Sequence, residues 1–396
     1  MLKKEDNELL CRVGPGTAMG SYMREFWIPA LRAERLEADG APIRVRLLGE
    51  DFVAFRSTDG RVGFFDEGCP HRGPSLALAR NEDNALTCIF HGWKFDVSGA
   101  CVEVPSEPPE RRAQFAAKVR IRHYPVREAG TIIWVYLGSR AQPPEFPRFN
   151  FTDLPQGHVT SALAVIPCNW FQGLEGQLDS AHVGILHSDW VQKSLYHDTG
   201  PRFEFEPQSY GYREAAVRRM PDGQHYVRVR DFALPWYSFI PMGSRADDHM
   251  LTMSVPVDDT HSAQWDVTYN FSRPVARYRR AAPQNLDNMA DGMALDDYYG
   301  QSRPRMREGS WSGFSFLRFE DFAVAIAQGP IVDRSREYLG SSDTSINRAR
   351  RMLLEAVRRH AKGEPTVGLQ QPIRWDTLEA QDAIIAADAD WRAVAR

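Results

Sequence analysis

Two pairs of cysteine and histidine residues in this chain have the types and spacing of metal ligands. Cys69 and His71 form a C-x-H pair, and Cys88 and His91 form a C-x-x-H pair further along the chain. A glycine closely follows each pair and permits a tight backbone turn beside a metal. The four side chains therefore predict one metal centre built from two short loops.

Two thiolates and two imidazoles are the ligand set of a Rieske [2Fe–2S] cluster, in which cysteines hold one iron and histidines the other. A structural zinc ion also accepts two cysteines and two histidines. Zinc modules usually pair like ligands, whereas each loop here supplies one cysteine and one histidine. The pattern favours the iron–sulfur cluster, with zinc as the alternative.

A second candidate metal site lies in the segment 169–187, which has helical character. Asp179 and His182 are three residues apart and share one face of a helix. His187 can reach the same metal as His182 only if the helix ends or deviates between them, which Gly184 allows. Two histidines and one carboxylate, with open positions opposite, are the ligands of non-haem Fe(II) oxygenases.

The carboxylate ligand of such a site has to come from another part of the chain. Asp321 is the best candidate, because an acidic pair opens the apolar stretch 322–326 and a carboxylate among buried residues usually needs a partner or a metal. Glu320 and Asp333 are the alternatives. An iron that activates O₂ needs electrons, which the cluster would deliver, so the two metal motifs support each other.

The composition is that of a soluble globular protein with a reduced cysteine set. With a net charge of −4, the chain has no basic footprint for nucleic acid. No apolar run approaches the roughly 20 residues of a membrane span, and the N-terminus lacks a signal core. Two of the five cysteines go to the cluster, and Cys11, Cys101 and Cys168 are expected to be free thiols. We expect a cytoplasmic protein.

The chain predicts an α+β protein with three regions. Residues 41–141 read as an antiparallel β domain that carries both ligand loops, with a hairpin turn at Asp59-Gly60. A proline-rich linker opens the region 142–396, which we expect to be the catalytic domain. Residues 1–40 are expected to pack on that catalytic domain.

Hydrophobic patterns predict strands and helices in the expected catalytic domain, residues 142–396. The expected strands cover 202–206, 212–219, 224–234, 249–257 and 263–272. Helices are expected near 277–300 and over 344–361. The last helix has an apolar face and Asp343 as its expected N-terminal cap. An antiparallel sheet with flanking helices is therefore the expected catalytic fold.

Nearly the whole chain resembles the oxygenase (α) component of Rieske non-haem iron aromatic-ring-hydroxylating oxygenases, most closely the phthalate-dioxygenase-like branch. Besides both metal motifs, the segments that carry the resemblance are 12–17, 49–51, 124–128, 328–334 and 337–340. The resemblance implies a helix-grip catalytic domain and a homotrimer. It also implies a separate NAD(P)H-dependent reductase that carries flavin and a [2Fe–2S] centre.

The resemblance also implies roles for individual residues. The ligands of the mononuclear iron would be His182, His187 and Asp321. Asp179 would link a cluster ligand of one subunit, His71 or His91, to His182 of its neighbour. One departure is visible, because many relatives have Glu-Asn where this chain has Glu175-Gly176.

The expected function is O₂-dependent hydroxylation (mono- or dioxygenation) or oxidative demethylation of a small aromatic compound, with an aromatic carboxylate as the favoured substrate. The arginines that could pair with a substrate carboxylate are Arg213, Arg218, Arg228 and Arg230, although alternating arginines on a strand often form a solvated face. Aromatic pocket candidates are Trp236, Tyr237, Phe239, Trp311 and Phe314. The alternative function is a Rieske electron-transfer protein without its own oxygenase chemistry.

Overall fold

The computed structural model describes residues 2–275, 285–291, 293, 295–370 and 372–394. The chain divides into two compact units. The smaller unit comprises residues 24–146, and the larger unit comprises residues 1–23 together with 147–396.

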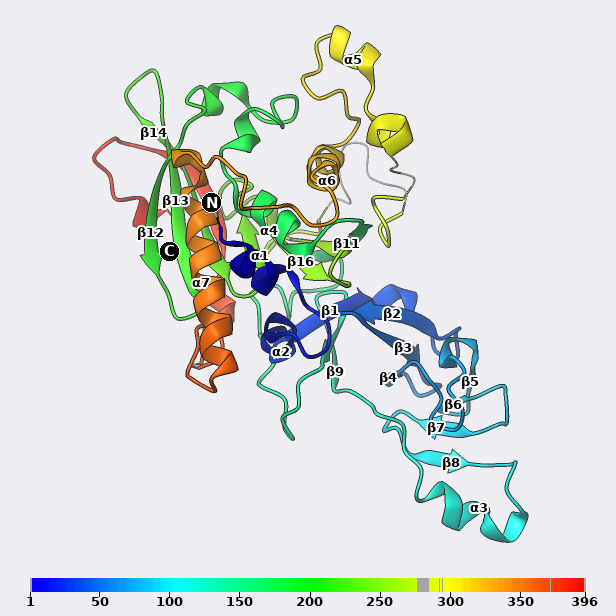
Figure 1. The fold of residues 1–396 in the computed structure, drawn as a ribbon. Coiled ribbons are helices and arrows are strands. Elements are labelled where there is room, and N and C mark those ends of the chain that lie inside the picture. Colours follow the sequence, from blue (N-terminus) through cyan, green and yellow to red (C-terminus); the bar gives the residue numbers. More distant parts are fainter. Residues whose placement is uncertain (1, 276–284, 292, 294, 371, 395–396) are drawn as a thin grey trace. The chain divides into compact units, whose positions relative to one another are not determined.

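Three small antiparallel sheets build the smaller unit (Figure 1). The first sheet has the order β1 (Trp27–Arg32), β10 (Ile132–Tyr136), β9 (Val126–Ala129). The second is the meander β2 (Ile43–Leu47), β3 (Glu50–Arg56), β4 (Val62–Asp66). The third is β5 (Arg80–Glu82), β6 (Ala85–Thr87), β7 (Lys94–Asp96), β8 (Cys101–Glu103), followed by helix α3 (Pro109–Ala116).

The core of the smaller unit surrounds the predicted cluster cysteines. Cys69 and Cys88 are buried in one cluster with Phe55, Phe65 and Phe95. Apolar burial of this kind contributes about 25 cal/mol per Å² and holds the two loop segments against the same core. The predicted hairpin is confirmed, because Gly60 has a φ of +86° between β3 and β4.

The boundary between the units differs from the expected one at residue 40. Strand β1 pairs along β10, and all six of its residues are buried, so residues 24–40 belong to the smaller unit. The helices α1 (Lys4–Cys11) and α2 (Ala18–Met23) belong to the larger unit and pack on its long helix α7 (Thr344–Ala361). Because all six residues of β1 (WIPALR) are buried, its sequence shows no alternation that would indicate a strand with one exposed face.

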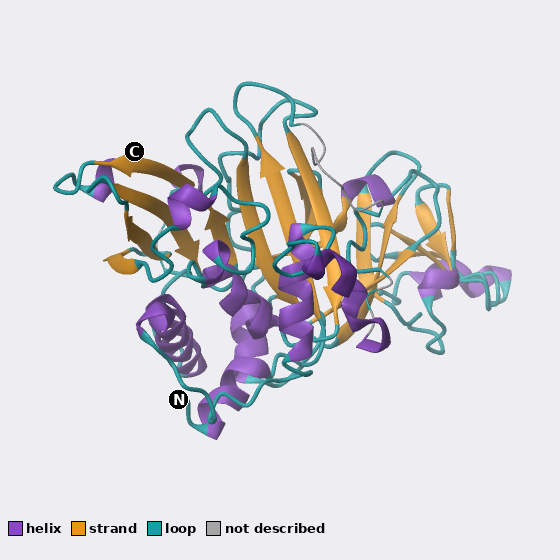
Figure 2. Cartoon of the chain, turned by 90° about the horizontal axis from the view of Figure 1, so that it is seen from above, coloured by secondary structure: helices purple, strands orange, loops and turns teal. Residues whose placement is uncertain are grey.

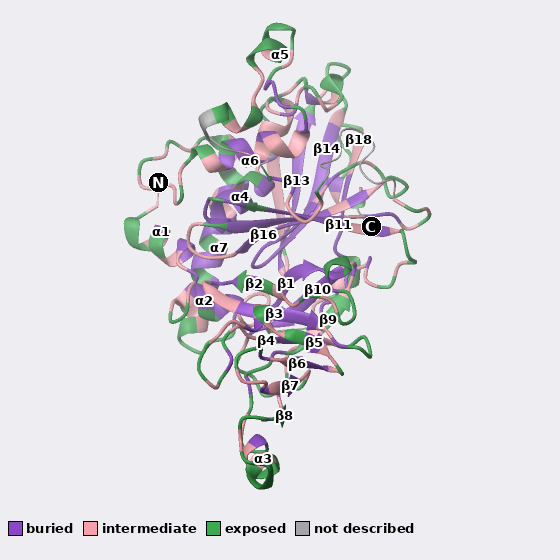
Figure 3. Ribbon diagram, turned by 90° about the vertical axis from the view of Figure 1, so that its right-hand side faces the viewer, coloured by how far each residue is buried: buried purple, intermediate pink, exposed green. Residues whose placement is uncertain are grey.

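One antiparallel sheet dominates the larger unit (Figures 1 and 2). Its strands are β11 (Val159–Ile166), β17 (Ser262–Tyr269), β16 (His249–Pro256), β15 (Tyr237–Ile240), β14 (His225–Ala233), β13 (Gly211–Arg219) and β12 (Arg202–Pro207), in that spatial order. A further strand, β18 (Ala380–Ile385), pairs with β14. Most residues of β13, β14 and β16 are buried (Figure 3). The sheet confirms the α+β prediction and each of the five expected strands.

Helices cover one face of this sheet (Figure 2). Helix α4 (Trp170–Leu178) packs on β15, β16 and β17, and helix α6 (Leu317–Ala327) packs on α4. Phe322 of α6 lies in one apolar cluster with Ala162 and Ala164 of β11. A shorter helix, α5 (Arg303–Arg307), precedes α6. The packing of α4 against α6 brings two segments far apart in sequence to the same place.

Helix α7 has the bounds that the sequence predicts, and its expected apolar face is buried. Asp343 occupies the predicted N-cap position, but its side chain makes no capping bond to α7, and its carboxylate accepts a hydrogen bond from the amide of Gly340. Of the helix expected near 277–300, residues 277–284, 292 and 294 lie outside the described residues. Residues 295–300 form a kinked 3₁₀ segment.

No helix in the described part of the chain combines the length and the apolar composition that crossing a membrane requires. All five cysteines are free thiols and all are buried.

Candidate metal centres

The two predicted cluster loops have the same backbone geometry. In each loop the amide of the cysteine donates to the carbonyl five residues later, with an N···O distance of 2.9 Å at both Cys69 and Cys88. Gly73 and Gly92 each donate back to the carbonyl of the cysteine four residues earlier. Both glycines have positive φ, +81° and +72°, which a residue with a Cβ rarely adopts. The loops therefore turn tightly enough to present their ligands together.

The structure places the four predicted cluster ligands as two like pairs. Burial first, and then the neighbouring Cys88 thiol, raise the pKa of Cys69 to about 11. The rings of His71 and His91 lie 4.6 Å apart between centroids. The buried Nδ1 of His91 has no hydrogen-bond partner among the described residues. Adjacent thiols, adjacent imidazoles and an unpaired ring nitrogen fit the donor set of a [2Fe–2S] cluster.

The second site depends on where α4 ends. The helix ends at Leu178, Asp179 is extended, and His182 lies in a separate 3₁₀ turn, His182–Gly184. The helix therefore ends before His182, not at Gly184 as the sequence suggested. Gly184 has a different role, because a Cβ there would lie 2.9 Å from the Cβ of Tyr196. Its small size lets Tyr196 pack directly on the turn that carries His182.

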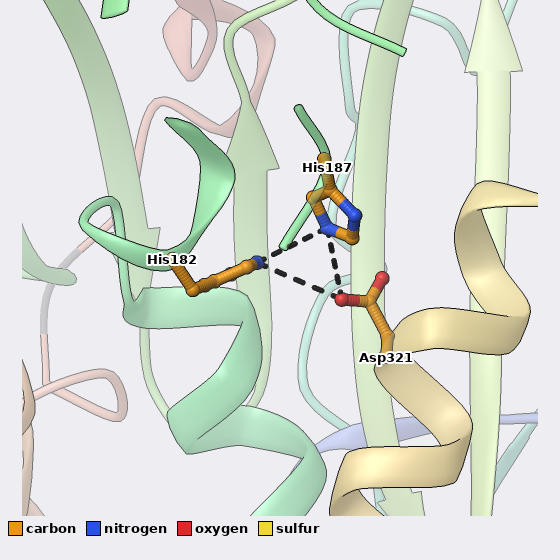
Figure 4. A group of neighbouring side chains, drawn as sticks. All are labelled: His182, His187 and Asp321. Carbon is orange, nitrogen blue, oxygen red and sulfur yellow. Dashed lines mark hydrogen bonds and ion pairs between the residues drawn. The ribbon is translucent and has the colours of Figure 1, made fainter. Parts of the chain in front are cut away.

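Three ligand atoms converge on one point (Figure 4). The Nε2 atoms of His182 and His187 are 3.2 Å apart, and Asp321 Oδ1 lies 3.1 Å from His187 Nε2 and 3.6 Å from His182 Nε2. Asp321 comes from α6, which packs on α4. Two imidazoles and one carboxylate fit the ligand set of a mononuclear non-haem iron.

Each ring nitrogen that points away from this site has its own carboxylate. Asp179 Oδ2 lies 3.4 Å from His182 Nδ1, and Glu320 Oε2 lies 2.5 Å from His187 Nδ1. Glu320 is fully buried and also accepts hydrogen bonds from Trp190 and Ser312. Such contacts fix the tautomer and the ring plane of a metal-binding histidine. Glu320 thus orients His187 and does not join the three converging atoms.

Contacts with neighbouring side chains distinguish Asp321 from the alternative carboxylate Asp333. Arg318 donates to Oδ2 of Asp321 at 2.6 Å, which turns the other oxygen, Oδ1, toward the histidines. Arg318 also pairs with the buried Asp266. Asp333 is exposed and bonds Ser335, away from this group. Sequence reasoning missed the orienting roles of Glu320 and Arg318, although both lie within three residues of Asp321.

Metal uptake by the second site should rise with pH. Burial alone would lower the pKa of His187, but Asp321 and Glu320 outweigh burial and raise that pKa to about 9. Because a metal must displace this proton, we expect the apparent Kd for Co²⁺ in iron-free protein to fall about tenfold per pH unit between pH 6 and 8. Equilibrium dialysis measures this Kd. Glu320→Gln should flatten the dependence, and a pH-independent Kd in the wild type would contradict the prediction.

The four predicted substrate arginines divide into two groups. Arg213 pairs with Asp231 at 2.8 Å, and Arg230 pairs with the fully buried Glu214 at 2.8 Å. Arg230 also donates to the carbonyls of Gln177 and Leu178 at the end of α4. These two guanidinium groups are therefore engaged by carboxylates of this chain. Arg218 and Arg228 are also buried, but no carboxylate of the described residues forms an ion pair with either.

Arg230 should contribute strongly to stability. Glu214 is fully buried, and its pKa is raised by burial although Arg230 opposes that rise. Arg230→Met removes the ion-pair partner of this carboxyl and the donor to two helix carbonyls, and leaves the carboxyl only its hydrogen bond from Ser345, so we expect a loss of about 3–5 kcal/mol in the free energy of unfolding. Urea denaturation followed by circular dichroism measures it. Arg202→Met, which removes an exposed pair with Glu204, should change stability by less than about 0.5 kcal/mol.

The predicted aromatic lining is mostly core. Trp236, Tyr237 and Phe239 are fully buried in the larger unit, whereas the Trp311 side chain is largely exposed. Phe314 is buried near the segment that leads to α6.

Two family models together match nearly the whole chain. A Rieske [2Fe–2S] domain model matches residues 26–125, and a model described as LigXa C-terminal domain like matches residues 135–396. The chain belongs to the Rieske non-haem iron oxygenases, in the phthalate-dioxygenase-like branch. The match to the Rieske model sets the zinc alternative aside.

Relatives of this Rieske oxygenase align over most of their length. The chain is 37% identical to the phthalate 4,5-dioxygenase oxygenase subunit of Pseudomonas putida, covering 99% of this chain and 94% of the relative. It is 34% identical to the 3-chlorobenzoate-3,4-dioxygenase oxygenase subunit of Comamonas testosteroni, covering 99% and 97%. It is 33% identical to the 5,5'-dehydrodivanillate O-demethylase oxygenase subunit of a Sphingobium species, covering 92% and 82%.

The fold is also that of a solved Rieske oxygenase. The oxygenase in the reduced oxygenase–ferredoxin complex of carbazole 1,9a-dioxygenase superposes with a TM-score of 0.57 and 19% identity, covering 88% of this chain and 95% of that chain. The relatives named above, and not this likeness of fold, show that the chain is an oxidoreductase of the class that incorporates O₂ into aromatic compounds or demethylates them. Its cofactors are a Rieske [2Fe–2S] cluster and a mononuclear non-haem iron.

Proposed function

We propose that this chain is the terminal oxygenase component of a multicomponent system that hydroxylates or oxidatively demethylates an aromatic carboxylate. The convergence of two imidazole nitrogens and one carboxylate oxygen at His182, His187 and Asp321 carries the proposal. The names of the relatives support the substrate class, since phthalate and 3-chlorobenzoate are both aromatic carboxylates.

Different residues would hold the cluster and the mononuclear iron. Cys69, His71, Cys88 and His91 would hold the cluster, and the triad His182, His187 and Asp321 would hold the iron. When bound, the iron activates O₂ with electrons that the cluster delivers. Glu320 keeps the Nδ1 proton of His187, and Arg318 holds the second oxygen of Asp321, so both ligands keep one orientation.

Asp179 would connect the two kinds of site across a homotrimer. Its carboxylate faces His182 Nδ1, and its other oxygen accepts a hydrogen bond from the amide of Ala181 at 2.7 Å. Burial would raise the pKa of Asp179, but contacts with His182 and with backbone amides hold it below its usual value. An ionised, partly exposed carboxylate at this place could accept a hydrogen bond from a cluster histidine of a neighbouring subunit.

The electron donor would be a separate NAD(P)H-dependent reductase with flavin and [2Fe–2S] centres, acting directly or through a ferredoxin. The carbazole system, whose oxygenase is solved with its ferredoxin, supports such a partner. We also propose that the protein works in the cytoplasm, where its five free thiols would stay reduced.

The iron and acid-labile sulfide content of anaerobically purified protein tests the proposed function. We expect about three irons and two sulfides per chain, with a red-brown colour that dithionite bleaches. O₂ uptake with dithionite or a reductase should then depend on an aromatic acid. Two irons that Fe(II) cannot raise to three would instead indicate an electron carrier, and zinc without sulfide would overturn the proposal.

A further inference from the structure

We propose that Arg218 and Arg228, with Ser180 and Tyr196, form the subsite that binds the carboxylate of the aromatic substrate. This inference rests on the proposed function, and it assigns carboxylate binding to two of the four candidate arginines. Both arginines are at least nine-tenths buried, with 0% and 7% of the residue surface exposed.

The register of the sheet places the two arginines side by side. Arg218 of β13 is paired with Tyr226 of β14, and Arg228 of β14 is paired with Ala216 of β13, so both lie diagonally on the same face. Residues of the other face, such as Val217 and Val227, pack with Trp391 in an apolar cluster. Arg230, on the same face of β14 as Arg228, donates to the carbonyls of Gln177 and Leu178, so the two guanidinium groups lie on the face of the sheet where α4 ends.

Four polar atoms in this place have no hydrogen-bond partner among the described residues. They are Nε and Nη1 of Arg218, Nε of Arg228 and Oγ of Ser180. The bonds that these side chains do make go to backbone carbonyls: Arg218 Nη2 to Ser180 at 2.5 Å, and Arg228 Nη2 to Pro241 at 3.1 Å. A buried donor without an acceptor is unfavourable, and a bound anion would supply the missing acceptor.

The described carboxylates near Arg218 and Arg228 form no ion pair with either guanidinium, so a bound anion could neutralise the two arginines. Burial and then the charge of Arg228 lower the pKa of Arg218 to about 10. Asp382 lies opposite Arg228 in the sheet, but burial raises the pKa of this carboxyl and no ion pair joins them. Asp198 accepts hydrogen bonds from the amides of Gly200 and Arg219. It forms no ion pair with Arg218, and its negative charge only partly opposes the lowering of the Arg218 pKa.

Arg218 contacts the chain segment that carries the predicted iron ligand His182. Ser180, which Arg218 contacts, directly follows Asp179, whose carboxylate faces His182. The Tyr196 ring lies under both guanidinium groups, 4.8 Å from Arg218 Cζ and 6.0 Å from Arg228 Cζ. The same Tyr196 packs on Gly184, in the turn that carries His182. A carboxylate held here would therefore lie beside the segment that carries His182.

Two arginines side by side select a carboxylate over a neutral group. A guanidinium fork matches the two oxygens of a carboxylate, and hydrogen bonds to ionised groups are about twice as strong as neutral ones. An aromatic amide of the same shape presents one acceptor and no charge. We therefore expect this site to discriminate between an aromatic acid and its amide.

Calorimetric binding to the anaerobic, iron-loaded protein tests the subsite without turnover. The probes are benzoate and phthalate, with benzamide as the neutral control. We expect at least one acid to bind about tenfold or more tightly than benzamide. Arg218→Gln and Arg228→Gln should each weaken that acid about 10- to 100-fold and leave benzamide unchanged. Arg219→Gln, an exposed neighbour, should change neither.

The outcomes separate the subsite from the proposed function. Equal affinity for acid and amide, or acid binding that both glutamine variants retain, would overturn the subsite even if the enzyme oxygenates aromatic compounds. Selective binding that depends on the arginines would uphold the subsite even if O₂ uptake failed. Where one glutamine variant does not fold, the other variant and the acid-to-amide ratio of the wild type decide.

Discussion

Asp321→Ala should lose the mononuclear iron and keep the cluster. The substitution removes the oxygen that lies 3.1 Å from His187 Nε2, and it leaves two imidazoles to hold the metal. We expect iron to fall from about three to about two per chain, with sulfide and the visible spectrum of the cluster unchanged. Substrate-dependent product formation should fall to background. Metal analysis, sulfide analysis and single-turnover product assays measure the three quantities.

Asp333→Ala is the matched control, because Asp333 was the other aspartate that the sequence allowed and its side chain is exposed. It should keep all three irons and full turnover. Retention of the third iron in Asp321→Ala, or its loss in the control, would remove Asp321 from the ligand set.

Asp179→Asn should leave both metal sites filled and stop electrons from reaching the iron. The amide keeps the size of the side chain but removes the charge that faces His182 Nδ1 at 3.4 Å. We expect coupled turnover to fall about 100-fold, the upper range for a group that orients a metal ligand. Stopped-flow oxidation of the reduced cluster, in the presence of substrate and O₂, measures the step directly. Normal turnover would remove the proposed bridge.

Mixed assemblies test whether this bridge joins different subunits. Asp179→Asn chains keep a working cluster, and His91→Ala chains keep a working Asp179 and iron. If the bridge crosses between subunits, co-expression of the two inactive variants should restore a measurable fraction of activity. If the connection lies within one chain, the mixture should stay as inactive as its parts.

Local patterns predicted most elements of the fold because each pattern is carried by neighbours in sequence. The expected strand 212–219 and helix 344–361 agree with β13 and α7 within one residue. Two strands whose partners lie far away in the sequence were missed. Strand β1 is buried on both faces, and β18 reaches its partner β14 from the far end of the chain. Their pairing depends on contacts that no window of sequence contains.

The candidate sites show the same division. His182 and His187 could be proposed from spacing, but α4 ends at Leu178, which the spacing did not reveal. The arginines of β13 and β14 looked equivalent in sequence. Their neighbours differ in space: Glu214 and Asp231 neutralise two of them, and Arg218 and Arg228 receive no such partner from the described residues.

The sequence by itself determined the donor types: two thiols, paired imidazoles and a carboxylate, each chemically suited to iron and written in short motifs. Only the tertiary structure decided which carboxylate faces the histidines and which one orients them. Asp321 and Glu320 are adjacent in the chain, but on α6 their side chains point about 100° apart, so Asp321 meets both Nε2 atoms while Glu320 meets Nδ1 of His187. Helix packing, and not the motif, assigns those two roles.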